Sequence, residues 1–180
     1  MTDDDGGRLE VGDDVDTGAE RVELTTGIPT RLTRATPIEL PLRAVNGYQG
    51  DPADFHSGRL CVMSERMVDV LRDAGVDNLQ VFPAQLVDER TGKRWPAAVV
   101  NVVGRVAAAD LAESERVNVG ETAPGEAHFA RLVVDPEALG GLLMVRLAES
   151  PTSLLIHEQV KQRLERASLT GVAMTEVATP

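Results

Sequence analysis

The pattern of apolar and polar residues in positions 61–81 is repeated in positions 154–174, with a constant offset of 93 residues and no gap. Each copy predicts a short apolar strand, a helix of about three turns and a second strand. Three pairs of aligned positions carry the same residue: Glu65 with Glu158, Leu71 with Leu164, and Ala74 with Ala167. Two copies are too few for a solenoid, so we expect two similar units packed in one domain.

Start and end signals support both predicted helices. Ser64 stands at the N-cap position of the first helix, and Glu65 follows beside the positive end of the helix dipole. In the second copy His157 takes the cap position, for which it is a poorer residue type, and Glu158 keeps the charge. Gly75 follows the first helix in the way a C′ glycine does.

A long β-hairpin is predicted after the first unit, with arms at 79–87 and 95–108 and a turn at 89–93. Gly92 supplies the residue able to adopt positive φ. The second arm is almost wholly apolar and β-branched, which favours a central strand. Asn101 interrupts it, and a buried amide needs partners. We expect either a structural bridge to a loop or a functional polar group.

The remaining pattern completes the expected fold. Residues 38–45 alternate in part and predict a strand that Pro41 would confine to a sheet edge. Together the elements predict an α+β fold in a single domain over residues 21–177. Its sheet is expected to be mostly antiparallel, with two main helices from the duplicated strand–helix–strand unit.

Trp95 stands at the start of the second hairpin arm. Its side chain either packs at the rim of the core or serves as a binding hot spot, and both interpretations are open.

Charge is concentrated at the start of the chain. The chain carries a net charge of −11, and residues 1–20 hold eight acids and one base, or −7. This polar, Gly- and Asp-rich segment predicts a flexible acidic tail, with an acidic docking arm as the alternative. The remaining residues carry a net charge of only −4, and they lack the excess of basic residues that a protein binding nucleic acid directly requires. A basic protein partner is compatible with this balance.

Targeting signals and cysteine usage indicate the cytoplasm. No apolar run approaches the ~20 residues that a membrane span requires. The first residues are acidic and lack the basic and apolar regions of a signal peptide. Cys61 is the single cysteine, so an intramolecular disulfide is excluded, and its place beside an apolar run predicts a small buried hydrophobe.

One loop, at 46–58, carries residues that could do chemistry. Asp51, Asp54 and His56 could form an acid–base or metal cluster. The alternative is structural: Asp51 starts a turn before Pro52, and Asp54 caps a local turn. The chain contains none of the common phosphate-binding, nucleophile, zinc or redox motifs. We therefore expect no catalytic residues, no cofactor and no metal, with a small enzyme using this loop as an alternative.

Several stretches resemble a known family. They include Val62-Met-Ser-Glu-Arg-Met-Val-Asp-Val-Leu71, Val99-Val-Asn101-Val-Val-Gly-Arg-Val-Ala-Ala-Ala-Asp110 and Leu143-Met-Val-Arg-Leu-Ala-Glu-Ser150. They are similar to the bacterial immunity proteins of polymorphic toxin systems, immunity family eleven, with its myxobacterial-type immunity domain. The resemblance covers roughly residues 36–175 and rests mostly on structural residues. His157 departs from the serine that the family often has there.

The resemblance implies a cytoplasmic inhibitor that binds a cognate toxin, often one that attacks nucleic acid, and so protects the producing or kin cell. Exposed acids are candidate contacts for such a toxin, and a solvated surface is their alternative role. These acids are Asp69, Asp73, Asp88 and Glu89. A structural or regulatory subunit of a larger assembly is a further alternative, for which an apolar oligomer interface would be the sign.

Overall fold

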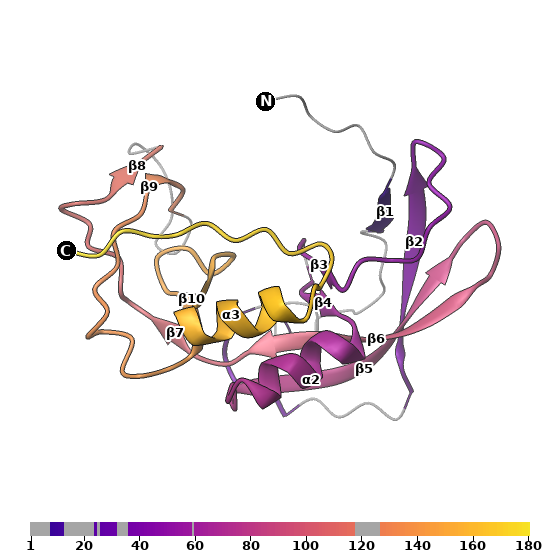
Figure 1. Cartoon of the computed structure of the whole chain (residues 1–180), viewed down its shortest axis with the longest axis horizontal. Coiled ribbons are helices and arrows are strands. Elements are labelled where there is room, and N and C mark those ends of the chain that lie inside the picture. The colour runs from indigo at the N-terminus through magenta and orange to yellow at the C-terminus, as the bar shows by residue number, and fades with distance from the viewer. Residues whose placement is uncertain (1–7, 13–23, 25, 32–35, 59, 118–126) are drawn as a thin grey trace.

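The structure is a computed structural model that describes residues 8–12, 24, 26–31, 36–58, 60–117 and 127–180. Its largest sheet has the strand order β1-β2-β5-β6-β4-β3, and Figure 1 labels all six of these strands. The β2–β5 pair is parallel, and the other pairs in this sheet are antiparallel. The strands are β1 (Arg8–Val11), β2 (Ile38–Val45), β3 (Phe55–His56), β4 (Val62–Met63), β5 (Leu79–Asp88) and β6 (Arg94–Val102).

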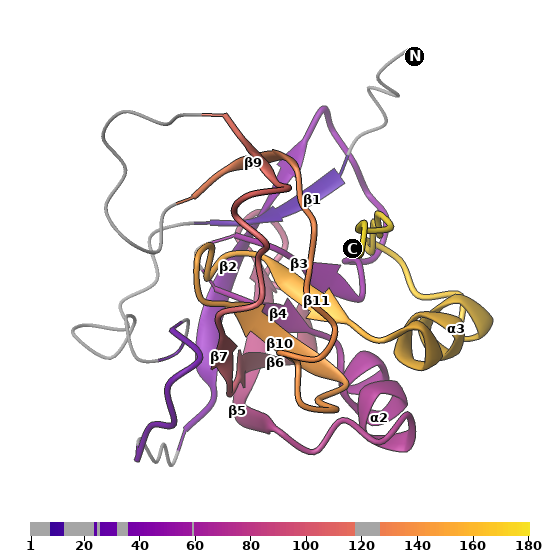
Figure 2. The same ribbon diagram turned by 90° about the vertical axis from the view of Figure 1, so that its left-hand side faces the viewer.

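Two smaller sheets and two helices complete the described fold. One sheet has the order β11-β10-β7, and the other pairs β8 with β9. The helices α2 (Glu65–Asp73) and α3 (Glu158–Arg166) lie side by side, as Figures 1 and 2 both show. The remaining strands are β7 (Arg105–Val106), β8 (Glu115–Arg116), β9 (Phe129–Arg131), β10 (Met144–Leu147) and β11 (Leu154–Ile156). The predicted single α+β domain class is confirmed.

The core around the large sheet forms two layers because strand side chains alternate between the faces of that sheet. One face packs against α2 and α3, and the other face forms a separate apolar cluster with β1 and residue 24. The helix-facing layer includes Met63, Met67, Leu71, Val100, Val160 and Leu164. The opposite layer includes Leu40, Leu42, Phe82, Leu86 and Val99.

The predicted hairpin is confirmed as β5 and β6. Asp88 closes its turn by accepting hydrogen bonds from the backbone N–H of Arg90 at 2.8 Å and of Thr91 at 3.1 Å. Gly92 adopts φ +71°, the conformation expected from its place in the turn. β6 lies between β5 and β4, so the prediction of a central strand is also confirmed.

The repeat is confirmed for the strand and helix of each copy. Ser64 caps α2 by accepting from Met67 N at 3.1 Å, and His157 caps α3 by accepting from Gln159 N at its Nδ1 at 3.2 Å. Gly75 follows α2 with φ +94°, and Ser168 follows α3 with φ +51° at the equivalent position. The left-handed backbone at this point is therefore shared by both units, although only one of them has glycine.

The second strand of the second copy was predicted wrongly. Residues 169–174 form no strand. In the first copy β5 pairs with β6 along its length, whereas the segment after α3 lies against the loop before β3. Gly171, with φ +77°, lies so close to Phe55 that an added Cβ would collide with the carbonyl oxygen of Phe55. Leu169 and Val172 still pack against the helix-side core.

The predicted edge position of Pro41 is also wrong, because β2 lies between β1 and β5. The carbonyl oxygen of Pro41 accepts a hydrogen bond from Gly12 N at 2.8 Å. The N and C=O of one strand residue point to the same side, so the missing N–H faces β1. Pairing with β1 ends at Val11–Leu42, one residue before the proline. Gly12 and Pro41 therefore share one hydrogen bond where a regular pair would have two, and the regular pairing of β1 with β2 ends at the proline.

β1 lies within the segment expected to be a flexible tail. Residues 8–11 pair with β2, and Leu9 is buried in the core. The rest of the 1–20 segment lies outside the described residues, apart from Gly12.

Asn101 is a structural bridge to a loop, which confirms that interpretation. The side chain is fully buried in β6. Its Oδ1 accepts from Gly27 N at 3.1 Å, and its Nδ2 donates to Ile28 O at 2.8 Å and to Gln80 Oε1 at 3.2 Å. One amide therefore binds the backbone of residues 27–28 to the centre of the sheet.

Candidate functional site

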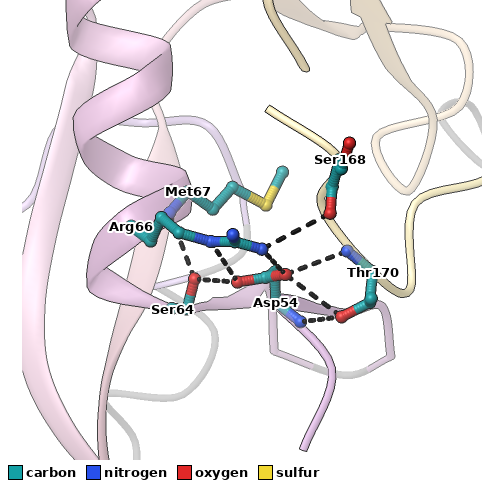
Figure 3. Close-up of polar contacts among 6 residues, drawn as sticks. All are labelled: Asp54, Ser64, Arg66, Met67, Ser168 and Thr170. Atoms are coloured by element: carbon teal, nitrogen blue, oxygen red, sulfur yellow. Dashed lines mark hydrogen bonds and ion pairs between the residues drawn. The ribbon is translucent and has the colours of Figure 1, made fainter. Parts of the chain in front are cut away.

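Asp54 joins the two repeat units through a network of hydrogen bonds, drawn in Figure 3. Its Oδ1 accepts from Ser64 Oγ at 2.7 Å, and its Oδ2 accepts from Arg66 Nη2 at 2.7 Å. Oδ2 also accepts from the backbone N of Thr170 at 2.9 Å and from its Oγ1 at 3.1 Å. Ser64 in turn caps α2, so the carboxylate holds the cap residue and the segment after α3 together.

The electrostatics of Asp54 favour its ionised form. Burial alone would raise the pKa of the carboxyl group. The hydrogen bonds from Arg66, Thr170 and Ser64 outweigh burial and hold the pKa of Asp54 well below its usual range. A carboxylate held in this way is a poor proton acceptor at neutral pH. The alternative that Asp54 caps a local turn is wrong, since its carboxylate accepts hydrogen bonds from Ser64, Arg66 and Thr170, and Thr170 lies 116 positions away.

Asp51 points to different partners. Its Oδ1 accepts hydrogen bonds from Lys93 Nζ at 2.9 Å and from Trp95 Nε1 at 3.1 Å. The bond from Lys93, reinforced by the bond from Trp95, lowers the pKa of Asp51. Lys93 also stands over the Trp95 ring, with Nζ 4.5 Å from the ring centroid. Asp51 therefore ties the loop before β3 to the start of β6.

A hollow of about 340 Å³ lies beside this contact. Its walls come from the 51–56 loop, the end of β4, the first turn of α2 and the β5–β6 hairpin. The residues that line it are Asp51, Pro52, Ala53, His56, Met63, Ser64, Glu65, Arg66, Leu86, Trp95 and Pro96. Asp51 and His56 thus share one hollow, whereas the carboxylate of Asp54 is engaged by Ser64, Arg66 and Thr170.

His56 is a half-buried imidazole in the wall of this hollow. Burial lowers its pKa, and a hydrogen bond with the backbone of Ala53 opposes that effect. Its Nε2 is shielded from solvent and has no hydrogen-bond partner within the described part of the chain. No group of three or more His, Cys, Asp or Glu side chains that could hold a metal ion occurs among the described residues.

Cys61 behaves as a buried apolar residue, as predicted. It belongs to the helix-side core, and burial raises the pKa of its thiol to about 11, although the charge of Arg146 acts in the opposite direction. The nucleophilic thiolate is therefore scarce at neutral pH.

Two of the four candidate contact acids, Asp69 and Asp73, are exposed on α2. Asp69 is 4.0 Å from Arg72 Nη1, at the limit for an ion pair. Asp73 has no hydrogen bond or ion pair with any of the described residues. Both carboxylates are therefore available to a partner.

The other two acids lie in the β5–β6 turn, which projects away from α2 at the right of Figure 1. Asp88 closes the turn, and hydrogen bonds from the side chain of Thr91 and from the backbone of Arg90 and Thr91 lower its pKa against the opposing effect of burial. Glu89 accepts from Arg43 Nε at 2.9 Å. The four acids thus form two separate groups.

Sequence reasoning missed the bonds of Asp54 to Arg66 and Thr170, and the contact among Lys93, Trp95 and Asp51. Lys93 and Trp95 are two positions apart, which is a usable sign because alternate strand residues share a face. No comparable spacing connects Asp54 with Thr170.

Comparison with families of known proteins shows the family of this chain. A family model described as an immunity protein family, Imm11, matches residues 30–179, which is most of the chain. This range contains the hairpin, both helices and the Asp54 network. No curated protein matches the chain. No helix in the described residues is long and apolar enough to cross a membrane.

Proposed function

We propose, from the premise that this chain belongs to the Imm11 immunity protein family, that it binds a cognate polymorphic toxin and neutralises it in the producing or kin cell. The family match over residues 30–179 is the observation that carries this proposal. An immunity protein is a non-enzymatic inhibitor, and its work is done by surface contacts. The site of action is the cytoplasm, where the toxin would otherwise reach its target.

The geometry supports inhibition by binding. Asp54, the most strongly perturbed carboxylate of the candidate loop, is engaged by an arginine, a serine and a threonine. His56 makes no hydrogen bond to a carboxylate or a second histidine among the described residues, although Asp51 lines the same hollow. The loop is better suited to holding α2 and the 168–171 segment in place than to transferring protons.

The toxin we propose acts on nucleic acid. A nuclease carries a basic groove for the phosphate backbone. The chain after residue 20 has a net charge of −4, which suits docking to a basic surface and disfavours direct binding to nucleic acid. Long-range attraction of this kind accelerates association and weakens as salt rises.

Two acidic groups are proposed as contacts. Asp69 and Asp73 on α2 are exposed and lightly bonded, which makes them the stronger pair. Asp88 and Glu89 in the hairpin turn have intramolecular partners that compete with a toxin. Rim charges of this kind affect the association rate more than the lifetime of a complex.

Coexpression with the toxin domain encoded beside this gene tests the proposal. The expected result is a complex that co-purifies through a sizing column and a toxin whose cleavage of DNA or RNA stops when the immunity protein is added. A toxin from a different locus serves as the control and should remain active. A neighbouring toxin that stays unbound and active would overturn the proposal, and a bound toxin acting on another target would overturn only the nuclease assignment.

A further inference from the structure

The start of β6 already holds a cation against an aromatic ring. Lys93 Nζ lies 4.5 Å from the centroid of the Trp95 ring and 2.9 Å from Asp51 Oδ1. Trp95 Nε1 donates to the same oxygen at 3.1 Å, which fixes the carboxylate beside the ring. An aromatic face next to a carboxylate is the combination that recognises an ammonium or guanidinium group.

The neighbouring hollow extends this arrangement. It has a volume of about 340 Å³, and Asp51, Glu65 and Trp95 all line it. Glu65 is exposed at the start of α2 and has no ion pair with any described residue. The charge of Arg66 is matched by Asp54 at 2.7 Å. The uncompensated charge at the hollow is therefore negative.

We propose that this hollow receives a basic side chain, lysine or arginine, from the toxin. The incoming group takes the place of Lys93 on Trp95 and Asp51 and forms an ion pair with Glu65. Lys93 thus occupies the site until the partner arrives. This inference rests on the proposed function and names the part of the toxin that the surface recognises.

Displacing Lys93 costs little. Its side chain is 59% exposed, and that of Asp51 is 75% exposed. Exposed ion pairs of this kind change an equilibrium by about fivefold or less. An incoming arginine gains more, because its planar guanidinium stacks on an aromatic ring and binds carboxylates with two donors. Tryptophan is also enriched among the residues that dominate binding energy at interfaces.

Two lysine variants distinguish an effect at this site from the effect of a changed net charge. The chain has two lysines, and Lys161 also faces a carboxylate, with Nζ 3.3 Å from Glu158 Oε2. Lys93→Ala removes the resident competitor and should bind the toxin domain roughly twofold to fivefold more tightly. Lys161→Ala removes the same charge away from the hollow and should bind as the unmodified protein does. Both dissociation constants are measured by calorimetry.

A second pair of variants tests whether Glu65 forms an ion pair with the incoming basic side chain. Glu65→Gln should weaken toxin binding about tenfold, because the incoming cation loses a charged partner. Asp77→Asn is the matched control, since Asp77 is exposed and does not line the hollow. It should leave the dissociation constant unchanged. Thermal unfolding of each variant shows whether a weaker affinity comes from a damaged fold.

Trp95 can report toxin binding at the hollow directly, because it is the only tryptophan in the chain. Protein made with 5-fluorotryptophan gives one ¹⁹F signal, which should shift when the toxin domain binds. Trp95→Phe keeps an aromatic ring in the sheet but loses the donor to Asp51, and it should weaken binding about tenfold. This variant avoids the loss of packing that alanine would cause.

The outcomes distinguish this inference from the proposed function. A complex with an unmoved ¹⁹F signal and equal affinities for Lys93→Ala and Lys161→Ala would overturn the basic-side-chain site and leave the inhibitor role intact. An active, unbound toxin would overturn both. A shifted signal, together with tighter binding of Lys93→Ala alone, would establish the site.

Discussion

Arg66 donates two hydrogen bonds to the carboxylate of Asp54, from Nη2 to Oδ2 at 2.7 Å and from Nε to Oδ1 at 3.3 Å. The same Nη2 reaches the carbonyl oxygen of Ser168 at 3.5 Å. At the other end of the helix pair, Gln159 Nε2 donates to Ala74 O at 3.1 Å. The start of α2 is thus bonded near the end of α3, and the end of α2 near the start of α3. Both ends of this antiparallel pair are fixed by polar side chains.

Replacing Asp54 should loosen this arrangement. Asp54→Asn removes the charge that Arg66, Ser64 and Thr170 share, and an amide offers only one acceptor oxygen. We expect the free energy of unfolding to fall by about 1.5–3 kcal/mol, the range for hydrogen bonds to charged groups. Urea denaturation measures this change. Asp77→Asn, at an exposed position, should change it by less than about 0.5 kcal/mol.

The pH dependence of stability should follow Asp54. Its pKa in the folded protein lies below its ordinary value of 3.8, so the unfolded chain takes up the proton first. The stabilisation is present above that value and is lost as the pH falls toward the lower folded pKa. Unfolding free energy should therefore decline from about pH 5 downward. Asp54→Asn should decline less steeply, and equal slopes for the two proteins would contradict this assignment.

Removing the buried amide of Asn101 should lower the free energy of unfolding, because its partners in the 27–28 loop lose their hydrogen bonds. Asn101→Ala leaves the backbone N–H of Gly27 and the carbonyl of Ile28 without their partner in the sheet. Stranded polar groups of this kind cost about 1–3 kcal/mol each. Hydrogen exchange at the Gly27 amide should accelerate more than at amides within β5. Unchanged protection of Gly27 would show that the bridge is dispensable.

At the equivalent left-handed positions after the two helices, removing a side chain should stabilise the protein and adding one should destabilise it. Ser168 adopts φ +51°, so Ser168→Gly should raise the free energy of unfolding by roughly 0.5–1 kcal/mol. Gly75 adopts φ +94°, and a Cβ there would lie 3.2 Å from Leu143 Cδ1. Gly75→Ala should therefore destabilise the protein by about 1 kcal/mol or more. Thermal unfolding of both variants checks the signs.

Charge reversal should separate the two proposed acidic contacts. Asp69→Lys with Asp73→Lys should slow association with a basic toxin about tenfold at low salt, with a smaller effect at high salt. Asp88→Lys with Glu89→Lys changes the charge equally, at the hairpin turn. The pair whose reversal lowers the association rate marks the docking face. Stopped-flow measurements at two salt concentrations provide both comparisons.

Local signals predicted much of this fold. The N-cap at Ser64, the positive φ of Gly75 and the turn at Gly92 each depend on neighbouring residues, and each could be read from short patterns. The central place of β6 followed from its apolar, β-branched composition. Such features need no knowledge of distant contacts.

What sequence reasoning missed depends on residues far apart in the chain. The repeat suggested a second strand at 169–174, but whether a segment becomes a strand depends on a neighbour with free backbone groups. Pro41 suggested a sheet edge, but a proline is also tolerated where the pairing with a neighbouring strand ends, and the point where β1 stops pairing with β2 cannot be read from the sequence. The partners of Asp54 could not be anticipated because Thr170 is reached only through the tertiary fold.

The span of the Asp54 bonds has a consequence during translation. A nascent chain that has not yet emerged as far as Thr170 lacks two of the four groups that hold this carboxylate. Contacts over such separations form late, because a long loop must close first. The ribosome must therefore deliver nearly the whole of the described chain before the segment after α3 can bind Asp54 and so be joined to the start of α2. A product cut short before Thr170 would keep the bonds of Asp54 to Ser64 and Arg66 but lose the link between the two repeat units.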